Sequence, residues 1–166
     1  MTRPFLFGIL VFVLATGLLR AQDAPAPKIY DPAADAQADL AQALRKADLE
    51  GKHVLVQVGG NWCSWCLKLE KLFASSDTIK RLLQDEFVFI HVNYSKENKN
   101  LPVLERLGFP QRFGFPALVV LDAKGVRLHT QDSGLLEENK GHSAEKVLTF
   151  LSKWTKKSLD PVLYRE

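Results

Sequence analysis

The 166-residue sequence has little cysteine and little methionine: it contains two cysteines and a single methionine, Met1. Two cysteines are too few for the framework of several disulfides that holds small secreted domains together. Neither sign of charge dominates, because 22 Lys and Arg stand against 19 Asp and Glu, and the basic residues form no cluster. The net charge of +3 therefore gives no basis for nucleic-acid binding. Any redox chemistry must rest on the one cysteine pair.

Long hydrophobic runs are also scarce. The uncharged apolar stretch at 5–19 is shorter than the about 20 residues that a membrane-crossing helix needs. Arg3 precedes this stretch, and a polar change follows it at 20–23, where the small residue Ala21 suits the position before a cleavage site. This pattern predicts a signal peptide over 1–21 that is cleaved after about Ala21, with an uncleaved membrane anchor as the alternative. The mature protein would then be periplasmic or secreted, in an oxidising compartment.

The rest of the chain divides into a linker, residues 22–34, and one domain, residues 35–166. The linker contains an alternation of Ala and Pro at 24–27, which favours an extended chain. Apolar spacing in the domain predicts helices over 35–50, 63–73, 77–84, 102–107 and 144–157, and strands over 54–58, 87–92, 117–121 and 126–130. Gly51 stands where a helix-ending glycine is expected. This order predicts an α/β fold with a central mixed sheet, a terminal antiparallel hairpin, and helices on both faces.

Cys63 and Cys66 lie where the strand at 54–58 gives way to a helix. At a helix N-terminus, unpaired N–H groups and the helix dipole stabilise a thiolate, so Cys63 should ionise more readily than a free cysteine. The spacing of three places Cys66 about one turn further along, close enough to pair with Cys63. We predict that Cys63 is the nucleophile and that Cys66 resolves the mixed disulfide.

Other roles for the same cysteines remain open. A purely structural disulfide would close so short a ring that it would stabilise the fold little. Zinc would need further ligands, and the histidines are scattered singly along the chain. Two thiolates suffice for Cu(I), so a soft-metal binding module is an alternative, although no methionine lies near the pair. If the pair is instead redox-active, we expect it to hold no metal. The protein would then be a disulfide reductase, oxidase or isomerase.

The motif Trp62-Cys63-Ser64-Trp65-Cys66, with Leu69, Glu70 and Phe73 behind it, resembles the thioredoxin superfamily, and most closely its exported disulfide reductase domains. A Gly114-Phe115-Pro116 sequence before the strand at 117–121 adds to the resemblance, which covers about 35–157. It implies a thioredoxin-like fold, thiol:disulfide oxidoreductase activity, and no cofactor beyond the Cys63–Cys66 disulfide. The partners expected of a monomer of this kind are protein or small-molecule disulfides and a separate redox donor or acceptor.

The resemblance also assigns residues to substrate binding. It implies a cis peptide bond before Pro116, close to Cys63, with the backbone of Phe115 available to pair with an extended substrate. Trp62 is expected beside the nucleophile. Trp65 is either an aromatic that contacts the partner or a ring that packs on its own helix.

Gln57 departs from the family pattern. A buried carboxylate commonly stands at this position, six residues before the first cysteine, where it is thought to exchange a proton with the resolving cysteine. A glutamine amide can form hydrogen bonds but cannot carry that proton at neutral pH. The resemblance therefore leaves the proton carrier of this protein unassigned, with water or a slower resolving step as the alternatives.

Overall fold

The computed structural model describes residues 28–165, so the predicted signal peptide lies outside the described residues. The helices are α1 (Ala36–Glu50), α2 (Ser64–Ser75), α3 (Asp77–Glu86), α4 (Leu101–Arg106) and α5 (Ala144–Lys153). The strands are β1 (His53–Gly59), β2 (Phe87–Asn93), β3 (Ala117–Leu121), β4 (Arg127–Asp132), β5 (Glu137–Glu138) and β6 (Gly141–His142). No helix in this part of the chain is long and apolar enough to cross a membrane.

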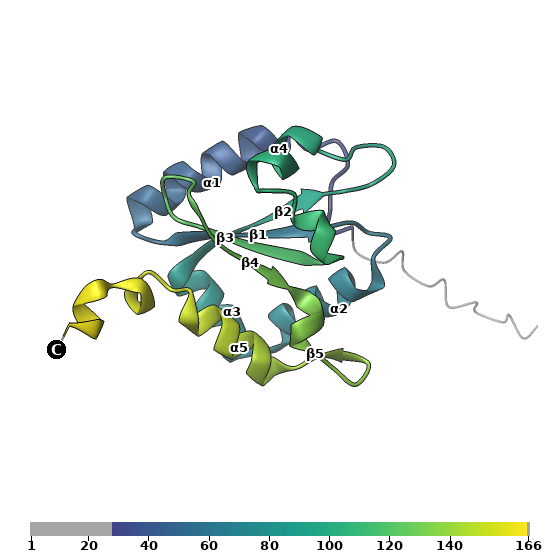
Figure 1. Ribbon diagram of the computed structural model, residues 1–166. Coiled ribbons are helices and arrows are strands. Elements are labelled where there is room, and N and C mark those ends of the chain that lie inside the picture. The colour runs from purple at the N-terminus through teal and green to yellow at the C-terminus, as the bar shows by residue number, and fades with distance from the viewer. Residues whose placement is uncertain (1–27, 166) are drawn as a thin grey trace, which may run out of the picture.

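The central sheet has the strand order β2-β1-β3-β4 (Figure 1). β1 runs parallel to β2 and antiparallel to β3, and β3 pairs with β4 as an antiparallel hairpin. The predicted mixed sheet with its terminal hairpin is therefore confirmed. A second hairpin, made of β5 and β6, lies outside this sheet and was not predicted from the sequence.

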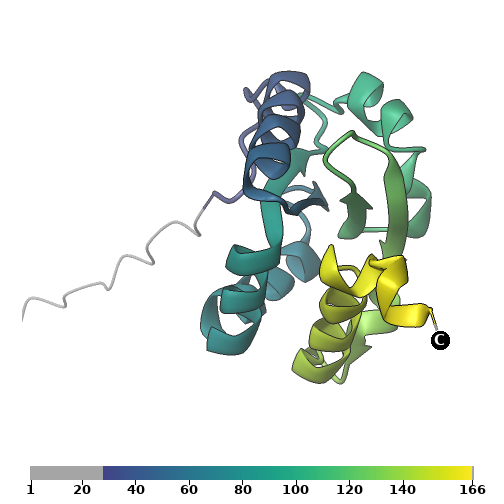
Figure 2. The ribbon, with the colours of Figure 1, turned by 90° about the vertical axis from the view of Figure 1, so that its left-hand side faces the viewer.

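Helices cover both faces of the sheet, as Figures 1 and 2 show: α1 and α4 lie on one side, and α2, α3 and α5 on the other. Every residue of β1 is buried because the strand is covered on both faces, which explains its nearly continuous apolar run. Alternate side chains of a strand point to opposite faces. Val56 packs in the core beneath α1, whereas Leu55 joins the core on the side of α2 and α3. Gln57 has the same parity as Leu55 and therefore points to the face that carries the cysteines.

Helix α1 has clear signals at both ends. The Asp35 carboxylate accepts hydrogen bonds from the backbone N–H groups of Gln37 and Ala38 at 3.0 and 3.1 Å. Gly51 ends the helix in the left-handed conformation, with φ of 68°, as predicted. Other residues adopt this conformation at a cost that glycine does not incur. Two local sequence signals therefore set where α1, the helix that packs against β1 and β2, begins and ends.

Replacing Asp35 by alanine is expected to lower the free energy of unfolding by about 1 kcal/mol, the usual cost of losing an N-cap side chain. Urea denaturation followed by circular dichroism measures the change. The matched control is Asp48→Ala near the other end of the same helix, where an exposed carboxylate faces the negative end of the helix dipole. Equal loss of stability in both variants would show that the effect does not come from the cap.

The C-terminal part differs from the sequence prediction. Helix α5 ends at Lys153 instead of near 157, and short 3₁₀ turns follow it. Trp154, which lies inside the predicted helix range, instead forms its C-cap. Its indole stacks on His129 with ring centroids 4.4 Å apart, and its carbonyl oxygen lies 2.9 Å from Nδ1 of His53. These contacts from two other elements hold Trp154 where the helix stops.

Candidate active site

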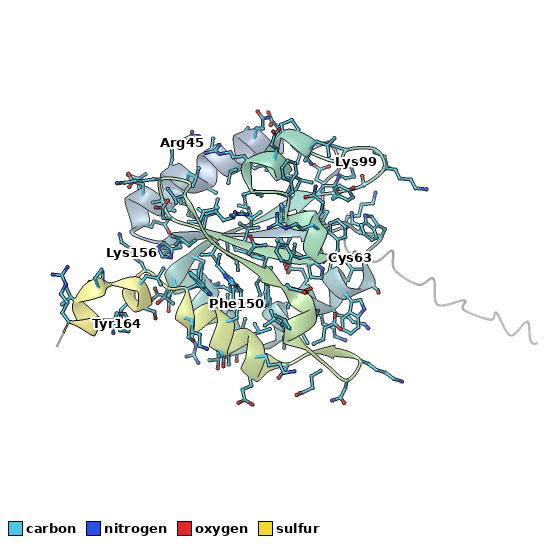
Figure 3. All side chains as sticks on the ribbon, viewed as in Figure 1. Arg45, Cys63, Lys99, Phe150, Lys156 and Tyr164 are labelled. Atoms are coloured by element: carbon cyan, nitrogen blue, oxygen red, sulfur yellow. A yellow bond between two sulfur atoms is a disulfide. The ribbon has the colours of Figure 1, made fainter. Side chains whose placement is uncertain are left out.

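The cysteine pair stands at the junction between β1 and α2. Cys63 is the N-cap of α2, and its sulfur accepts a hydrogen bond from the backbone N–H of Cys66 at 3.1 Å. The two residues form a disulfide, with their Cα atoms 5.2 Å apart. Figure 3 shows Cys63 at the start of α2. In the reduced protein, the same N–H groups and the helix dipole would stabilise a Cys63 thiolate.

The two cysteines differ in their access to solvent. Cys63 is 6% exposed, whereas Cys66 is 0% exposed. Cys66 lies in the first turn of α2, on the face that packs against the sheet. Cys63 is therefore the more accessible of the two cysteines to an incoming disulfide.

The loop before β3 lies beside the cysteines. Because β1 and β3 are antiparallel and Val58 pairs with Ala117, the start of β3 lies next to the end of β1. The Phe115–Pro116 peptide bond is cis. The Phe115 ring packs against the cluster that contains Cys63 and Cys66. The predicted cis bond and its place beside the cysteine pair are confirmed.

Two of the four residues predicted to bind substrate form one aromatic surface. Trp62 is 58% exposed, and its Nε1 donates a hydrogen bond to the carbonyl oxygen of Tyr94 at 2.6 Å. Its ring meets Phe115 edge to face, with centroids 5.2 Å apart, and Phe115 stacks on Tyr94. This surface joins the start of α2 to the loop that carries Pro116. Substrate contact by these residues remains a prediction.

Trp65 also packs against the cluster that contains Cys63 and Cys66, but its ring contacts are different ones. Its ring packs edge to face on His142 of β6, with centroids 5.4 Å apart, and the Lys68 ammonium lies 4.1 Å from its centroid. Burial lowers the pKa of His142 below its ordinary value, and the nearby Lys68 charge lowers it further. The partly buried Trp65 thus connects α2 to the small β5–β6 hairpin. Of the two roles considered for this ring, packing is the one with observed contacts.

Tyr30 is a buried residue of the site that the sequence prediction missed. It lies in the segment that the sequence assigned to the linker, yet it is only 1% exposed and packs against both cysteines. The Oδ1 atom of Asn61 accepts hydrogen bonds from the backbone N–H groups of Ile29 and Tyr30, and its Nδ2 donates to the Tyr30 carbonyl oxygen. The loop that leads into Cys63 therefore fixes this segment in place. Only the apolar pair Ile29-Tyr30 after the Pro-rich stretch could have signalled it.

Gln57 contacts Tyr30 inside the protein. Its side chain is 0% exposed, and Nε2 donates a hydrogen bond of 2.6 Å to the Tyr30 hydroxyl oxygen. Within residues 28–165, Gln57 Oε1 has no hydrogen-bond partner. The position that commonly carries a carboxylate in the family thus holds a neutral amide paired with a phenol.

Gly59 brings this pair close to the disulfide. A Cβ atom at Gly59 would stand 2.6 Å from the Sγ of Cys66 and 2.7 Å from the Tyr30 hydroxyl oxygen. Both distances are well below van der Waals contact, so a glycine is required here for close packing. The Tyr30 hydroxyl and the Cys66 sulfur therefore converge on the space that this glycine leaves open.

Two ionisable groups lie behind Tyr30. Nε2 of His91 on β2 contacts Oε1 of Glu70 on α2 at 2.5 Å, and the His91 ring meets the Tyr30 ring edge to face. Burial raises the pKa of the Tyr30 hydroxyl above its ordinary value, and the Glu70 charge raises it further, against an opposing effect of the Gln57 hydrogen bond. The phenol is therefore protonated at neutral pH. Nε2 of His91 is already in contact with the Glu70 carboxylate.

The described residues, 28–165, contain no group of three or more His, Cys, Asp or Glu side chains that could hold a metal ion. The redox group that the structure does contain is the Cys63–Cys66 disulfide, which belongs to the protein itself.

Known proteins resemble this chain in sequence and in structure. The thiol:disulfide interchange protein DsbD of Klebsiella pneumoniae is 27% identical over 136 residues, which cover 75% of this chain and 22% of DsbD. This chain therefore spans less than a quarter of that relative. The crystal structure of a disulphide isomerase from Xylella fastidiosa superposes with a TM-score of 0.67 at 27% identity, over 75% of this chain and 94% of the isomerase.

The fold is shared more widely. The oxidised C-terminal domain of Neisseria meningitidis DsbD superposes with a TM-score of 0.53 at 16% identity, over 73% of this chain and 97% of that domain, which shows the fold alone. A family model described as thioredoxin-like matches residues 35–123, which include the cysteine pair and the cis proline. The chain belongs to the thioredoxin-like family, and its Cys63–Cys66 pair is the redox centre of a thiol:disulfide oxidoreductase.

Proposed function

We propose that this protein is an exported disulfide reductase in which Cys63 is the nucleophile and Cys66 the resolving thiol. The Cys63 thiolate attacks one sulfur of a substrate disulfide, forms a mixed disulfide and releases the other substrate sulfur as a thiolate. Cys66 then attacks Cys63, releases the second substrate thiol and closes the Cys63–Cys66 bond. Two electrons pass to the substrate. The observation that carries these roles is the difference between a helix-capping Cys63 and a fully buried Cys66.

The substrate would bind across the cis-proline loop. An extended segment on either side of a cystine can pair with the backbone at Phe115, a mode that holds a chain with little regard to its sequence. The exposed Trp62 ring beside it offers an apolar contact. We propose protein or small-molecule disulfides as substrates and a separate redox partner that returns electrons to the pair. The name of the Klebsiella relative, a thiol:disulfide interchange protein, supports exchange with such a partner.

Export rests on the sequence of residues 1–21. Each reduction of a substrate closes the Cys63–Cys66 disulfide, and an oxidising compartment does not reopen it. A reductase there depends on an electron donor that reduces the pair again.

A disulfide isomerase is the second candidate, because the related Xylella structure carries that title. Both activities begin with attack by Cys63. They differ in whether the Cys63–Cys66 bond closes, and this depends on the reduction potential of the pair. A redox titration against glutathione buffers measures that potential. A strongly reducing value would favour the reductase, and a value near that of the glutathione couple would favour isomerisation.

The Cys66→Ser variant provides the direct test of the cysteine roles. Without the resolving thiol, Cys63 should stay covalently bound to its substrate. In the experiment, the reduced variant is mixed with insulin, which serves as a model protein disulfide. We expect an adduct on non-reducing gels that dithiothreitol releases, and none with the Cys63→Ser/Cys66→Ser control. Absence of the adduct would contradict the proposal. Stoichiometric copper in the purified wild-type protein would instead favour a metal-binding module.

A further inference from the structure

We propose that, in the reduced protein, the Tyr30 hydroxyl donates a hydrogen bond to the sulfur of Cys66, beside Gln57, which stands where the family commonly has a buried carboxylate. The inference rests on the proposed function, since it concerns the resolving step. It gives Tyr30 the role of holding Cys66 as a thiolate, both when Cys66 attacks and when it leaves.

Geometry carries the first part of the argument. The Tyr30 hydroxyl oxygen and the Cys66 Sγ lie within 2.7 Å of the same point, the position that a Cβ on Gly59 would occupy. Tyr30 and the two cysteines form one buried cluster. At 0% and 1% exposure, neither Cys66 nor Tyr30 is open to bulk water. A thiolate formed at Cys66 would thus be desolvated, and an uncompensated buried charge is costly.

The hydrogen-bond pattern leaves the phenol proton free. Gln57 donates its amide N–H to the Tyr30 oxygen, so the phenol oxygen acts as acceptor in this contact and its own hydrogen is available to another group. Tyr30 and Gln57 form a short chain from β1 toward the sulfur. Hydrogen bonds in such a chain polarise each other, so Gln57 orients Tyr30 and strengthens it as a donor.

The charges nearby keep the phenol protonated. Burial and the Glu70 carboxylate on α2 both raise the pKa of Tyr30. His91 on β2 packs on the Tyr30 ring and is paired with Glu70. Lys68 lies over the Trp65 ring, next to His142 of β6. A protonated phenol can stabilise a thiolate, but it cannot serve as a base at neutral pH.

The role follows the exchange chemistry. During resolution, the Cys66 thiolate attacks the Cys63 sulfur of the mixed disulfide, the Cys63–Cys66 bond forms, and the substrate sulfur leaves with the electron pair. During recharging, a donor thiolate attacks Cys63, and Cys66 leaves as the thiolate. In both directions the Tyr30 hydroxyl donates a hydrogen bond to the Cys66 thiolate and keeps its own proton. The proton that the Cys66 thiol loses is balanced by the proton that the departing substrate thiolate takes up.

The Tyr30→Phe variant tests the donor, because it keeps the ring packing and removes the hydroxyl. Reduced protein is mixed with glutathione disulfide, and acid quench with mass spectrometry follows formation and resolution of the Cys63–glutathione adduct separately. We expect the pH midpoint of resolution to move upward, with a resolution rate about ten-fold lower below it, the scale of a hydrogen bond to a charged group. Formation of the adduct should be unchanged. Tyr164→Phe, which removes an exposed hydroxyl, is the matched control.

Two outcomes separate this inference from the proposed function. If the wild-type protein forms no adduct, the proposed exchange is wrong and the role of Tyr30 falls with it. If the wild-type protein forms and resolves the adduct, and Tyr30→Phe resolves it with the same pH profile, the role of Tyr30 alone is overturned. Glu70 and His91 are present in both proteins, so a difference between the two profiles reports the hydroxyl.

A measurement on the unmutated chain keeps the inference testable if Tyr30→Phe does not fold. In reduced protein labelled with ¹³C at cysteine Cβ and tyrosine Cζ, we expect the Tyr30 signal to move together with the titration of Cys66. The signals of Tyr94 and Tyr164 should not follow it. A Tyr30 signal that stays constant while Cys66 titrates would overturn the inference.

Discussion

The Cys63→Ala variant is expected to reduce insulin about 10³-fold more slowly than the wild-type protein, or slower still, the scale on which removing a covalent nucleophile lowers turnover. The remaining thiol, Cys66, is 0% exposed and packs against Tyr30 and Gly59. It therefore cannot approach a substrate disulfide in place of Cys63. The rate of insulin precipitation at a fixed concentration of dithiothreitol measures the loss.

The matched control is Cys66→Ala, which removes the other half of the pair. It should also stop turnover, but with glutathione disulfide it should still form the first mixed disulfide in a single turnover, because Cys63 keeps its place at the helix N-terminus. Cys63→Ala should form none. A Cys63→Ala protein that forms the adduct, or that keeps more than about a tenth of the turnover rate, would show that the nucleophile has been assigned to the wrong cysteine.

The Gly59→Ala variant should lose both stability and redox activity. The added Cβ would meet the Cys66 sulfur at 2.6 Å and the Tyr30 hydroxyl oxygen at 2.7 Å. Neither atom can move away freely, since the sulfur is held in the disulfide and the phenol in a buried cluster. We expect the free energy of unfolding to fall by about 1–3 kcal/mol, the usual cost of overpacking a core. Urea denaturation of the oxidised protein measures it.

Two comparisons isolate the cause. Gly141→Ala places the same methyl group where nothing lies within 4 Å, so it should change the stability by less than about 0.5 kcal/mol. In the double variant Gly59→Ala/Tyr30→Phe the phenol oxygen is gone, and we expect its loss of stability to be smaller than the sum for the two single variants. Strict additivity would contradict the close approach of Gly59 and Tyr30.

Local patterns accounted for most of the fold. The apolar run of β1 predicted a strand buried on both faces, and Gly51 predicted the end of α1; both predictions are confirmed. Such signals are short-range, because helix and strand periods and capping preferences are properties of neighbouring residues. The end of α5 was predicted less well. There Trp154 packs on His129, and His53 contacts its carbonyl group, so distant residues decide where the helix stops.

The site likewise contains some residues that the sequence predicts and others that only the tertiary structure reveals. The Cys63–Cys66 pair is visible in the sequence, because a spacing of three at the start of a helix brings two side chains together without help from the rest of the chain. The cis bond at Pro116 was implied by family resemblance; the residues themselves favoured trans. Tyr30 is the clearest omission, because its segment reads as an extension of the Pro-rich linker, and its burial depends on Asn61 and Gln57.

By itself, the sequence determined the order of the five helices and of the four strands of the central sheet, the covering of that sheet on both faces, and a cysteine at a helix N-terminus. Each of these depends on residues a few positions apart. Only the tertiary structure decided that Tyr30 and Gln57 meet beside the Cys66 sulfur and that Trp62 and Phe115 share one surface. These contacts join segments far apart in the chain, and the packing of the sheet brings them together.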